Sequence, residues 1–384
     1  MYKNYADPSV HCSLESVDLS GCSKLLNNGL LKKPREAEHL ENVDENRSAI
    51  QLSTSSVYEI LKLPLYLLPS RKQEDSLHLL LPYLSRFPCL EYLDLSFCNL
   101  FQIPDSIGSL QSLISLNLGG NKFARLPTTI KDLSSLCEFN LNHCMQLTYL
   151  PELPAIKEKT SARYYRELYV FNCPKLSEMA HNYRMFFSWM IRLFKAFLKP
   201  SLSLGKIQIV IPGAQIPRWF SNQNVGSSIK MDLSSVMDDP NWMGVACCAL
   251  LAAHDDPTNL NDKWQVDYHG DIGYNFPDLL PNQYWVLPIL LNNDLVTGGI
   301  DHLFILFASP EHIISDQSRY KGEMHDLDKM VFETKIYEHP KGLHLEVKNC
   351  GYRTVYKKDL QQFNLNMMFS GNFSSNKLKL LSSD

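Results

Sequence analysis

The chain has 384 residues, of which 45% are hydrophobic and 20% charged, a globular balance with room for more than one core. Its 37 basic and 41 acidic residues give a formal net charge of -4, which argues against a general nucleic-acid binder. No apolar run reaches about 18 residues, so no transmembrane segment is expected. None of the ten cysteines lies at C-x-x-C spacing, so a zinc site has no support and we expect buried, reduced thiols.

Three ungapped segments of the type Leu-x-x-Leu-x-Leu begin at Leu90, Leu113 and Leu136, a spacing of 23 residues. This period predicts an α/β leucine-rich-repeat solenoid, in which each segment is a short strand with its leucines in the interior. An Asn at the following turn can satisfy backbone groups of the next coil, and Cys is a smaller, weaker substitute. An apolar residue followed by Pro keeps nearly the same step, at Ile103-Pro104, Leu126-Pro127 and Leu150-Pro151.

Weaker copies of the repeat begin at Leu14 and Tyr165, so we assign residues 1–178 to the repeats. The pattern is irregular over 23–89, where the polar stretch 32–56 predicts either an insertion loop or degenerate coils. No polar cap precedes the first copy, although solenoids need capped ends. We therefore expect a fragment of a longer protein or the product of a truncated gene.

The residues between the interior leucines are expected on the concave face of the solenoid. Mixed polar and aromatic side chains there suit a protein ligand, although any such solenoid exposes these positions to solvent. The candidate contacts are Tyr92, Asp94, Phe97, Asn117, Glu138, Asn140, His143 and Tyr169.

A basic, aromatic-rich segment, His181 to Lys199, has apolar residues at helical spacing, and we assign 179–203 to an amphipathic connecting helix. Such a helix can lie on a membrane or bind a partner. We favour a helix that closes the solenoid and packs against the next domain, because tertiary packing usually explains an apolar stripe.

Residues 204–362 change to a strand period of two. About nine short strands separated by turn residues predict an all-β sandwich of jelly-roll or immunoglobulin-like type, followed by a flexible tail over 363–384. The expected strands lie near 207–211, 229–233, 245–253, 263–269, 283–290, 303–308, 329–337, 343–347 and 351–357.

Several polar and aromatic residues of this domain are candidates for chemistry or contact. The long polar loop expected from His254 to Tyr284 is the preferred contact region, with an ordinary surface loop as the alternative. Its candidate contacts are Trp264, Tyr268 and Tyr274. Trp219 and Phe220 fit the core better than a partner surface. The pairs His254-Asp255 and Asp301-His302 fit polar strand ends better than a metal or acid–base site.

Several segments together carry a resemblance to a known family. The stretches Ile211 to Phe220, Trp242 to Ala249 and Val347 to Arg353 occur in the order found in C-JID, the post-repeat domain of plant TIR-NBS-LRR disease-resistance receptors. The repeats resemble the last coils of those receptors. The resemblance implies that repeats and C-JID recognise a pathogen effector, that a nucleotide-binding domain then oligomerises the receptor, and that a TIR domain cleaves NAD.

The chain departs from the complete family because it contains no G-x-x-x-x-G-K-[ST] motif. ATP binding, oligomerisation and NAD cleavage are therefore not carried over, and we expect no enzyme, metal or cofactor. The expected partners are a pathogen effector and the nucleotide-binding and TIR domains of a receptor, in cis or in trans. The expected location is the cytoplasm and also the nucleus. Two alternatives stay open: a truncated decoy or regulatory partner of a full receptor, and an unrecognised hydrolase in the sandwich.

Overall fold

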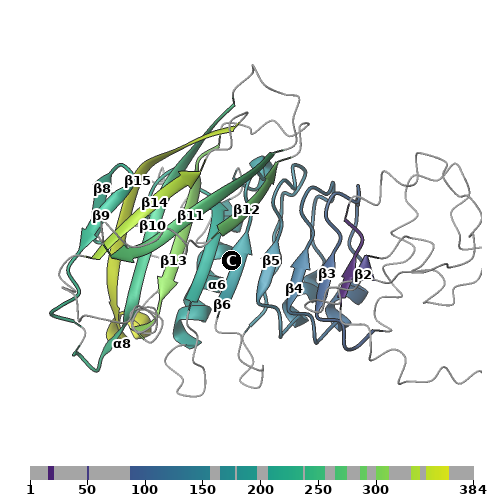
Figure 1. The fold of residues 1–384 in the computed structure, drawn as a ribbon. Helices are drawn as coiled ribbons and strands as arrows, with labels where there is room; N and C mark the ends of the chain where they lie inside the picture. Colours follow the sequence, from purple (N-terminus) through teal and green to yellow (C-terminus); the bar gives the residue numbers. More distant parts are fainter. Residues whose placement is uncertain are drawn as a thin grey trace, which may run out of the picture. The chain divides into compact units, whose positions relative to one another are not determined.

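The computed structural model describes residues 16–20, 50–51, 87–155, 165–177, 180–196, 206–236, 238–255, 264–274, 286–291, 300–310, 330–337 and 343–362 (Figure 1). The chain divides into two compact units, Met1–Lys157 and Glu158–Asp384. The last predicted coil, which begins at Tyr165, therefore lies in the second unit. No helix in the described part of the chain is long and apolar enough to cross a membrane.

The first unit is a stack of parallel strands in the order β2-β1-β3-β4-β5 (Figure 1). In β1, β3, β4 and β5 the central residue is buried and its two neighbours are half-buried, because successive side chains point to opposite faces of a strand. The predicted solenoid is confirmed here. The strands are β1 (Ser16–Asp18), β2 (Ile50–Gln51), β3 (Tyr92–Asp94), β4 (Ser115–Asn117) and β5 (Glu138–Asn140).

Short 3-10 helices follow the proline of two repeats. η3 (Asp105–Ser109) begins after Pro104 and η4 (Thr128–Asp132) after Pro127. The proline ring fixes φ at a value that suits the start of a helix. The two helices pack closely, since the Thr129 hydroxyl donates to the Asp105 carbonyl at 2.8 Å.

The strand β1 lies directly beside β3, although residues 19–91 separate them in the sequence. Ser16 pairs with Tyr92, and the Leu19 N–H donates to the Asp94 carbonyl at 2.8 Å. No coil can therefore lie between β1 and β3. β2 pairs with the other side of β1. Apart from β2, the region where an insertion loop or degenerate coils were expected lies outside the described residues.

The turn after each strand is held by an Asn or a Cys. Asn121 is buried, and its amide donates to the carbonyls of Leu95 and Leu118 at 2.9 and 2.8 Å. The Cys98 thiol donates to the Leu19 carbonyl at 2.9 Å. Both residues reach the preceding coil, so the expected direction, toward the next coil, was wrong.

The second unit contains two β-sheets. In the larger sheet the order is β6-β7-β13-β10-β15-β8, in which β6 and β7 are parallel and the other pairs antiparallel. In the smaller sheet the order is β12-β11-β14-β9. The strands are β6 (Tyr165–Tyr169), β7 (Lys206–Pro212), β8 (Asn222–Val225), β9 (Ser228–Met231), β10 (Trp242–Asp255), β11 (Trp264–Tyr274), β12 (Val286–Leu291), β13 (His302–Ala308), β14 (Met330–Tyr337) and β15 (Leu343–Tyr356).

One buried cluster joins residues from both sheets. Met231 and Phe332 of the smaller sheet pack with Val210, Cys247 and Phe304 of the larger sheet. The other expected strands are confirmed, but those expected at 343–347 and 351–357 form the single strand β15, and the polar strand β8 was not foreseen. One prediction is wrong: β11 occupies part of the loop expected from His254 to Tyr284.

The predicted connecting helix is α6 (Ala180–Ala196), which follows the short helix α5 (Pro174–Ser177). Seven apolar side chains of α6 are buried, and Phe194 lies 5.1 Å from Phe307 and 5.9 Å from Trp219 between ring centroids. The helix therefore packs against the C-terminal domain, as we favoured from the sequence, while its closing of the solenoid stays a prediction. The C-terminal helix α8 (Lys357–Gln362) directly follows β15.

Candidate functional site

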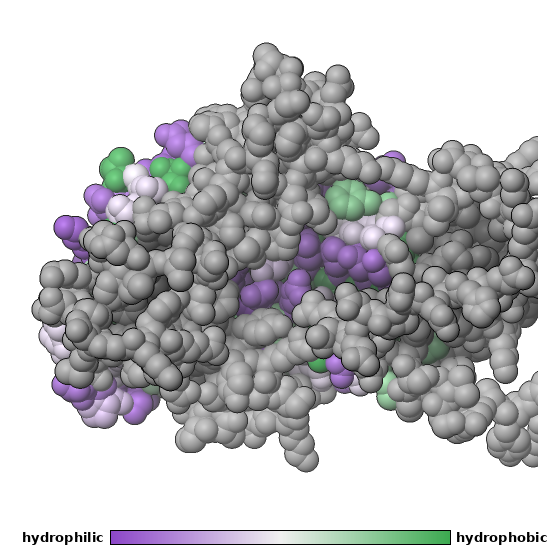
Figure 2. All heavy atoms as spheres, in the orientation of Figure 1, coloured by the Kyte–Doolittle hydropathy of each residue, from purple (hydrophilic) through white to green (hydrophobic). Residues whose placement is uncertain are grey.

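The predicted concave positions form two rows across the first unit. In the outer row, Ser16, Tyr92, Ser115 and Glu138 occupy equivalent positions of neighbouring strands. In the turn row, Asp18, Asp94, Asn117 and Asn140 do the same. All eight residues are half-buried. Figure 2 shows mainly hydrophilic residues where Figure 1 places β3 to β5.

The side chains of the turn row mainly form hydrogen bonds within the repeats. Asp94 Oδ1 accepts from the Ser96 N–H at 2.8 Å and the Ser96 hydroxyl at 2.6 Å. Asp94 Oδ2 accepts from the Asn117 amide at 2.8 Å. Asn117 and Asn140 accept the N–H two residues ahead in the same way, at 3.1 and 2.9 Å. Burial raises the pKa of Asp94, against the lowering effect of these hydrogen bonds.

The residue just before each Asn or Cys of the turn adopts a left-handed backbone. Phe97, Gly120 and His143 are equivalent, with φ of 55, 68 and 61°. The Phe97 ring lies over Gly120, where a Cβ atom would come within 2.2 Å of it. His143 is buried, so its expected exposure on the concave face was wrong. Phe97 is half-buried, so it is part of the turn and is also partly exposed at the surface.

Tyr169 was also expected on the exposed face, and the structure places it in the core instead. It is 3% exposed, belongs to the cluster shared by the two sheets, and donates its hydroxyl to Glu167 at 2.6 Å. The smaller sheet, which the repeat pattern does not show, explains this burial. An exposed contact role for Tyr169 is therefore not supported.

The aromatic candidates of the C-terminal domain lie on β11. β11 (Trp264–Tyr274) contains all three residues, and its backbone pairs with β12 and β14. Their binding role stays a prediction.

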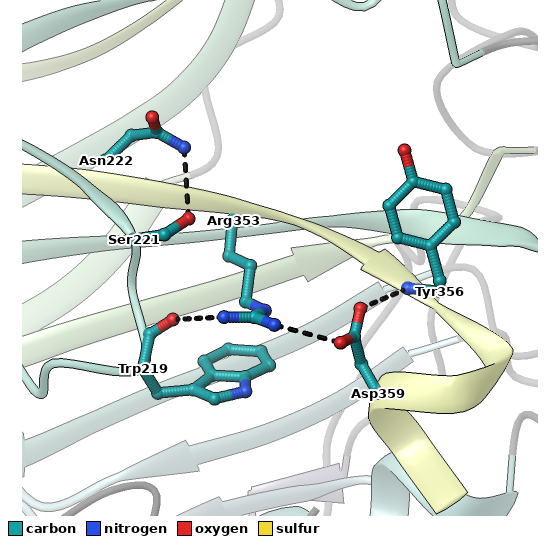
Figure 3. A network of polar contacts seen from close by, with 6 residues as sticks. All are labelled: Trp219, Ser221, Asn222, Arg353, Tyr356 and Asp359. Carbon is teal, nitrogen blue, oxygen red and sulfur yellow. Dashed lines mark hydrogen bonds and ion pairs between the residues drawn. The ribbon is translucent and has the colours of Figure 1, made fainter. Parts of the chain in front are cut away.

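Trp219 is joined to the end of the domain by Arg353 (Figure 3). The guanidinium donates to the Trp219 carbonyl at 3.1 Å and to Asp359 Oδ1 at 2.9 Å, and its Cζ lies 5.3 Å from the Trp219 ring centroid. Asp359 Oδ2 also accepts the Tyr356 N–H at 2.9 Å. Trp219 and Phe220 are buried, as predicted.

The candidates for acid–base chemistry have structural partners. His302 is buried against Phe171, and its Nε2 accepts the Asn172 N–H at 2.9 Å. Asp301 pairs with Lys348 at 2.8 Å. The side chains of His254 and Asp255 lie outside the described residues. Among the described residues, no three His, Cys, Asp or Glu side chains are grouped to hold a metal.

The described cysteines are free thiols, and all except the half-buried Cys89 are buried. Burial raises the pKa of Cys144 to about 12 and that of Cys247 and Cys248 well above the ordinary value. A protonated thiol is a poor nucleophile, so these groups serve packing rather than reaction. Cys12 and Cys22 lie outside the described residues.

Comparison with known proteins agrees with both units. Residues 88–145 match the leucine-rich-repeat family and residues 211–361 match the C-JID domain. TMV resistance protein N of Nicotiana glutinosa is 32% identical over 265 residues, which cover 63% of this chain. The chain has the repeat and C-JID regions of TIR-NBS-LRR disease-resistance proteins. Disease resistance-like protein DSC1 and disease resistance protein RPS4B, both of Arabidopsis thaliana, are 28% and 23% identical over 42% and 61% of this chain.

The chain spans only 23%, 15% and 22% of the lengths of these three relatives. A leucine-rich-repeat protein of Leptospira interrogans aligns over 20% of the chain and 22% of its own, with 25% identity and a TM-score of 0.16. Within the C-JID match, the first and last segments that carried the resemblance meet at the contact between Trp219 and Arg353 (Figure 3). This contact could not be predicted from a local pattern, because the two residues are 134 positions apart.

Proposed function

We propose that this chain is the effector-recognition portion of an intracellular plant immune receptor. One observation carries the proposal: the outer row presents Tyr92, Ser115 and Glu138 side by side on hydrogen-bonded strands. The names of the related disease-resistance proteins support an immune role for this chain.

The outer row suits a protein surface better than a small molecule. Adjacent strands lie about 4.8 Å apart, so a row of four strands spans roughly 14 Å. It offers an aromatic ring, three hydroxyl groups and one carboxylate, which is the mixture typical of protein interfaces. Because the hydrogen bonds of the turn row order the same strands beside the outer row, little order has to be gained on binding.

Three finer expectations belong to the same proposal. The two sheets would form a sandwich of jelly-roll or immunoglobulin-like type, whose loops add contacts beside β11. Nucleotide-binding and TIR domains would act in cis or in trans. The protein would work in the cytoplasm and the nucleus.

The test uses the complete chain as bait for individually expressed, secreted pathogen proteins in leaf tissue. We expect at least one protein to be captured, and its capture to fall at least tenfold with Tyr92→Ala or Glu138→Lys. Thr128→Lys is the matched control, because Thr128 is exposed on η4, outside both concave rows. Equal capture by well-folded outer-row variants would show that the concave face is not the binding surface.

The same experiment separates the decoy alternative. Recovery of a full-length receptor, with no pathogen protein captured by the native chain, would favour a regulatory partner. Loss of capture in Thr128→Lys as well as in the outer-row variants would place the contact elsewhere on the repeats.

A further inference from the structure

A second surface of the repeats lies outside the concave rows. It consists of Phe101, Lys122, Arg125 and Tyr149, which we call the aromatic–basic flank. Phe101 is 53% and Tyr149 39% exposed, and only one other described residue is a comparably exposed large apolar side chain. Scattered exposed apolar residues are ordinary, but here the two rings lie on the coils of β3 and β5, on either side of the β4 coil that carries Lys122 and Arg125.

Each ring of the flank is paired with a cation. Lys122 Nζ lies 5.7 Å from the Phe101 centroid, and Arg125 Cζ lies 5.9 Å from the Tyr149 centroid. Within the described part of the chain neither Lys122 nor Arg125 forms an ion pair with a carboxylate. The flank therefore presents two positive charges that no carboxylate among the described residues neutralises.

The flank is fixed by backbone hydrogen bonds between coils. The Lys122 N–H donates to the Leu100 carbonyl at 2.9 Å, and the Thr148 N–H donates to the Ala124 carbonyl at 2.9 Å. Arg125 and Tyr149 form a parallel bridge. These contacts make a short second ladder beyond the concave strands. The backbone that carries the four side chains is thus ordered before a partner binds, which lowers the entropic cost of binding.

We propose that the aromatic–basic flank binds an acidic segment of a protein partner, separately from the ligand of the concave face. Carboxylates of the partner would pair with Lys122 and Arg125, and its apolar side chains would cover Phe101 and Tyr149. Arg and aromatic residues are the side chains that most often dominate protein interfaces. The guanidinium of Arg125 can also hold a carboxylate with two parallel hydrogen bonds.

A nucleic acid would also be attracted by rings and cations, but the charges favour a protein. Two cations neutralise few phosphates, whereas nucleic-acid sites gain most of their affinity from many such contacts. Asp105 and Glu152, which are both exposed, follow the flank segments closely in their repeats. Their carboxylates would repel a continuous polyanion, while a peptide can place its acids selectively.

The test is selection of a random 12-residue peptide display library on the complete chain. The native chain should enrich peptides that combine Asp or Glu with aromatic residues. The doubly substituted Lys122→Glu and Arg125→Glu chain should bind the selected peptides at least tenfold more weakly. Lys131→Glu is the matched control, since Lys131 is an exposed cation on η4, and it should bind them as the native chain does.

The double variant Phe101→Ala and Tyr149→Ala should also bind the selected peptides more weakly. This result would show that the rings contribute to binding in addition to the charges. No acidic enrichment on the native chain, or equal binding by the double-Glu variant, would overturn the proposal. Tight binding of a fluorescent 12-nucleotide oligouridine that the same variant abolishes would overturn it in favour of a nucleic acid. All substituted side chains are exposed, so retained circular dichroism is expected in every variant.

Discussion

Replacement of Asn121 by Ala would test how the coils are held together. The Asn121 amide donates to the carbonyls of Leu95 and Leu118, and its oxygen accepts the Leu100 N–H at 3.0 Å. The side chain is buried, so water cannot replace these hydrogen bonds in the variant. Alanine therefore removes the hydrogen-bond partner of one backbone donor and one partner from each of two backbone acceptors.

The structure sets the size of the expected loss. A buried donor left without an acceptor costs about 1–3 kcal/mol. The Leu118 carbonyl keeps the Cys144 thiol as a donor at 3.4 Å, so its loss is small. We expect Asn121→Ala to lower the local free energy of unfolding by about 3 kcal/mol in total. Asn121→Cys should lose about half as much, because Cys98 donates to a carbonyl from the equivalent position.

Amide hydrogen exchange on the complete chain would measure this loss. Peptides from residues 90–150 should lose protection in the order native, Asn121→Cys, Asn121→Ala, and peptides from β10 and β13 serve as the internal reference. Native protection in Asn121→Ala would refute the assigned role of the amide. Equal losses in the Cys and Ala variants would refute the idea that a thiol substitutes for it.

Three further outcomes follow from the second unit and the thiols. Arg353→Lys should lower the free energy of unfolding by about 2 kcal/mol, measured in urea by tryptophan fluorescence, because an ammonium cannot keep two directed hydrogen bonds and the ring contact; an unchanged midpoint would contradict this. Gly244→Ala should cost at least about 3 kcal/mol, since its φ is 130° and a Cβ would lie 2.1 Å from a carbonyl oxygen. Gly226→Ala, with φ 96° and nothing within 4 Å, should cost only about 1 kcal/mol, and similar losses would refute the role of the close approach. Burial raises the pKa of Cys144 from 9.0 to about 12. The contribution of this thiol to the free energy of unfolding is therefore complete below pH 9 and falls between pH 9 and 12, by up to about 1.4 kcal/mol per pH unit. Cys144→Ser should flatten the alkaline part of a stability–pH curve.

The periodic features could be predicted from the sequence because one physical rule fixes each of them. Leu90, Leu113 and Leu136 are buried because every coil needs the same interior contact. The continuous apolar runs at 245–252 and 303–308 became strands buried on both faces: both contribute to the cluster shared with the smaller sheet, and Phe307 contacts Phe194 of α6. In these cases a local pattern is sufficient.

Other features depend on which surface covers a residue, and the pattern contains no such information. Tyr169 has the pattern of an exposed concave residue, yet it is buried with residues of the smaller sheet. β8 is entirely exposed and polar, so no alternation marks it as a strand. The partner of His302 lies 130 residues away, on a turn that the sequence did not connect with it.

The position of β1 beside β3 has a consequence for the order of folding. Paired residues of β3 and β4 are 23 positions apart, whereas Ser16 and Tyr92 are 76 apart (92 − 16). For flexible connections, the entropy of closing the longer loop adds about 1 kcal/mol to the cost of the contact. The coils from β3 to β5 are therefore expected to form first, and the β1 coil to join a surface that already exists. On unfolding, the same coil would separate first, so the contact between β1 and β3 is also where the solenoid can open without loss of the coils from β3 to β5.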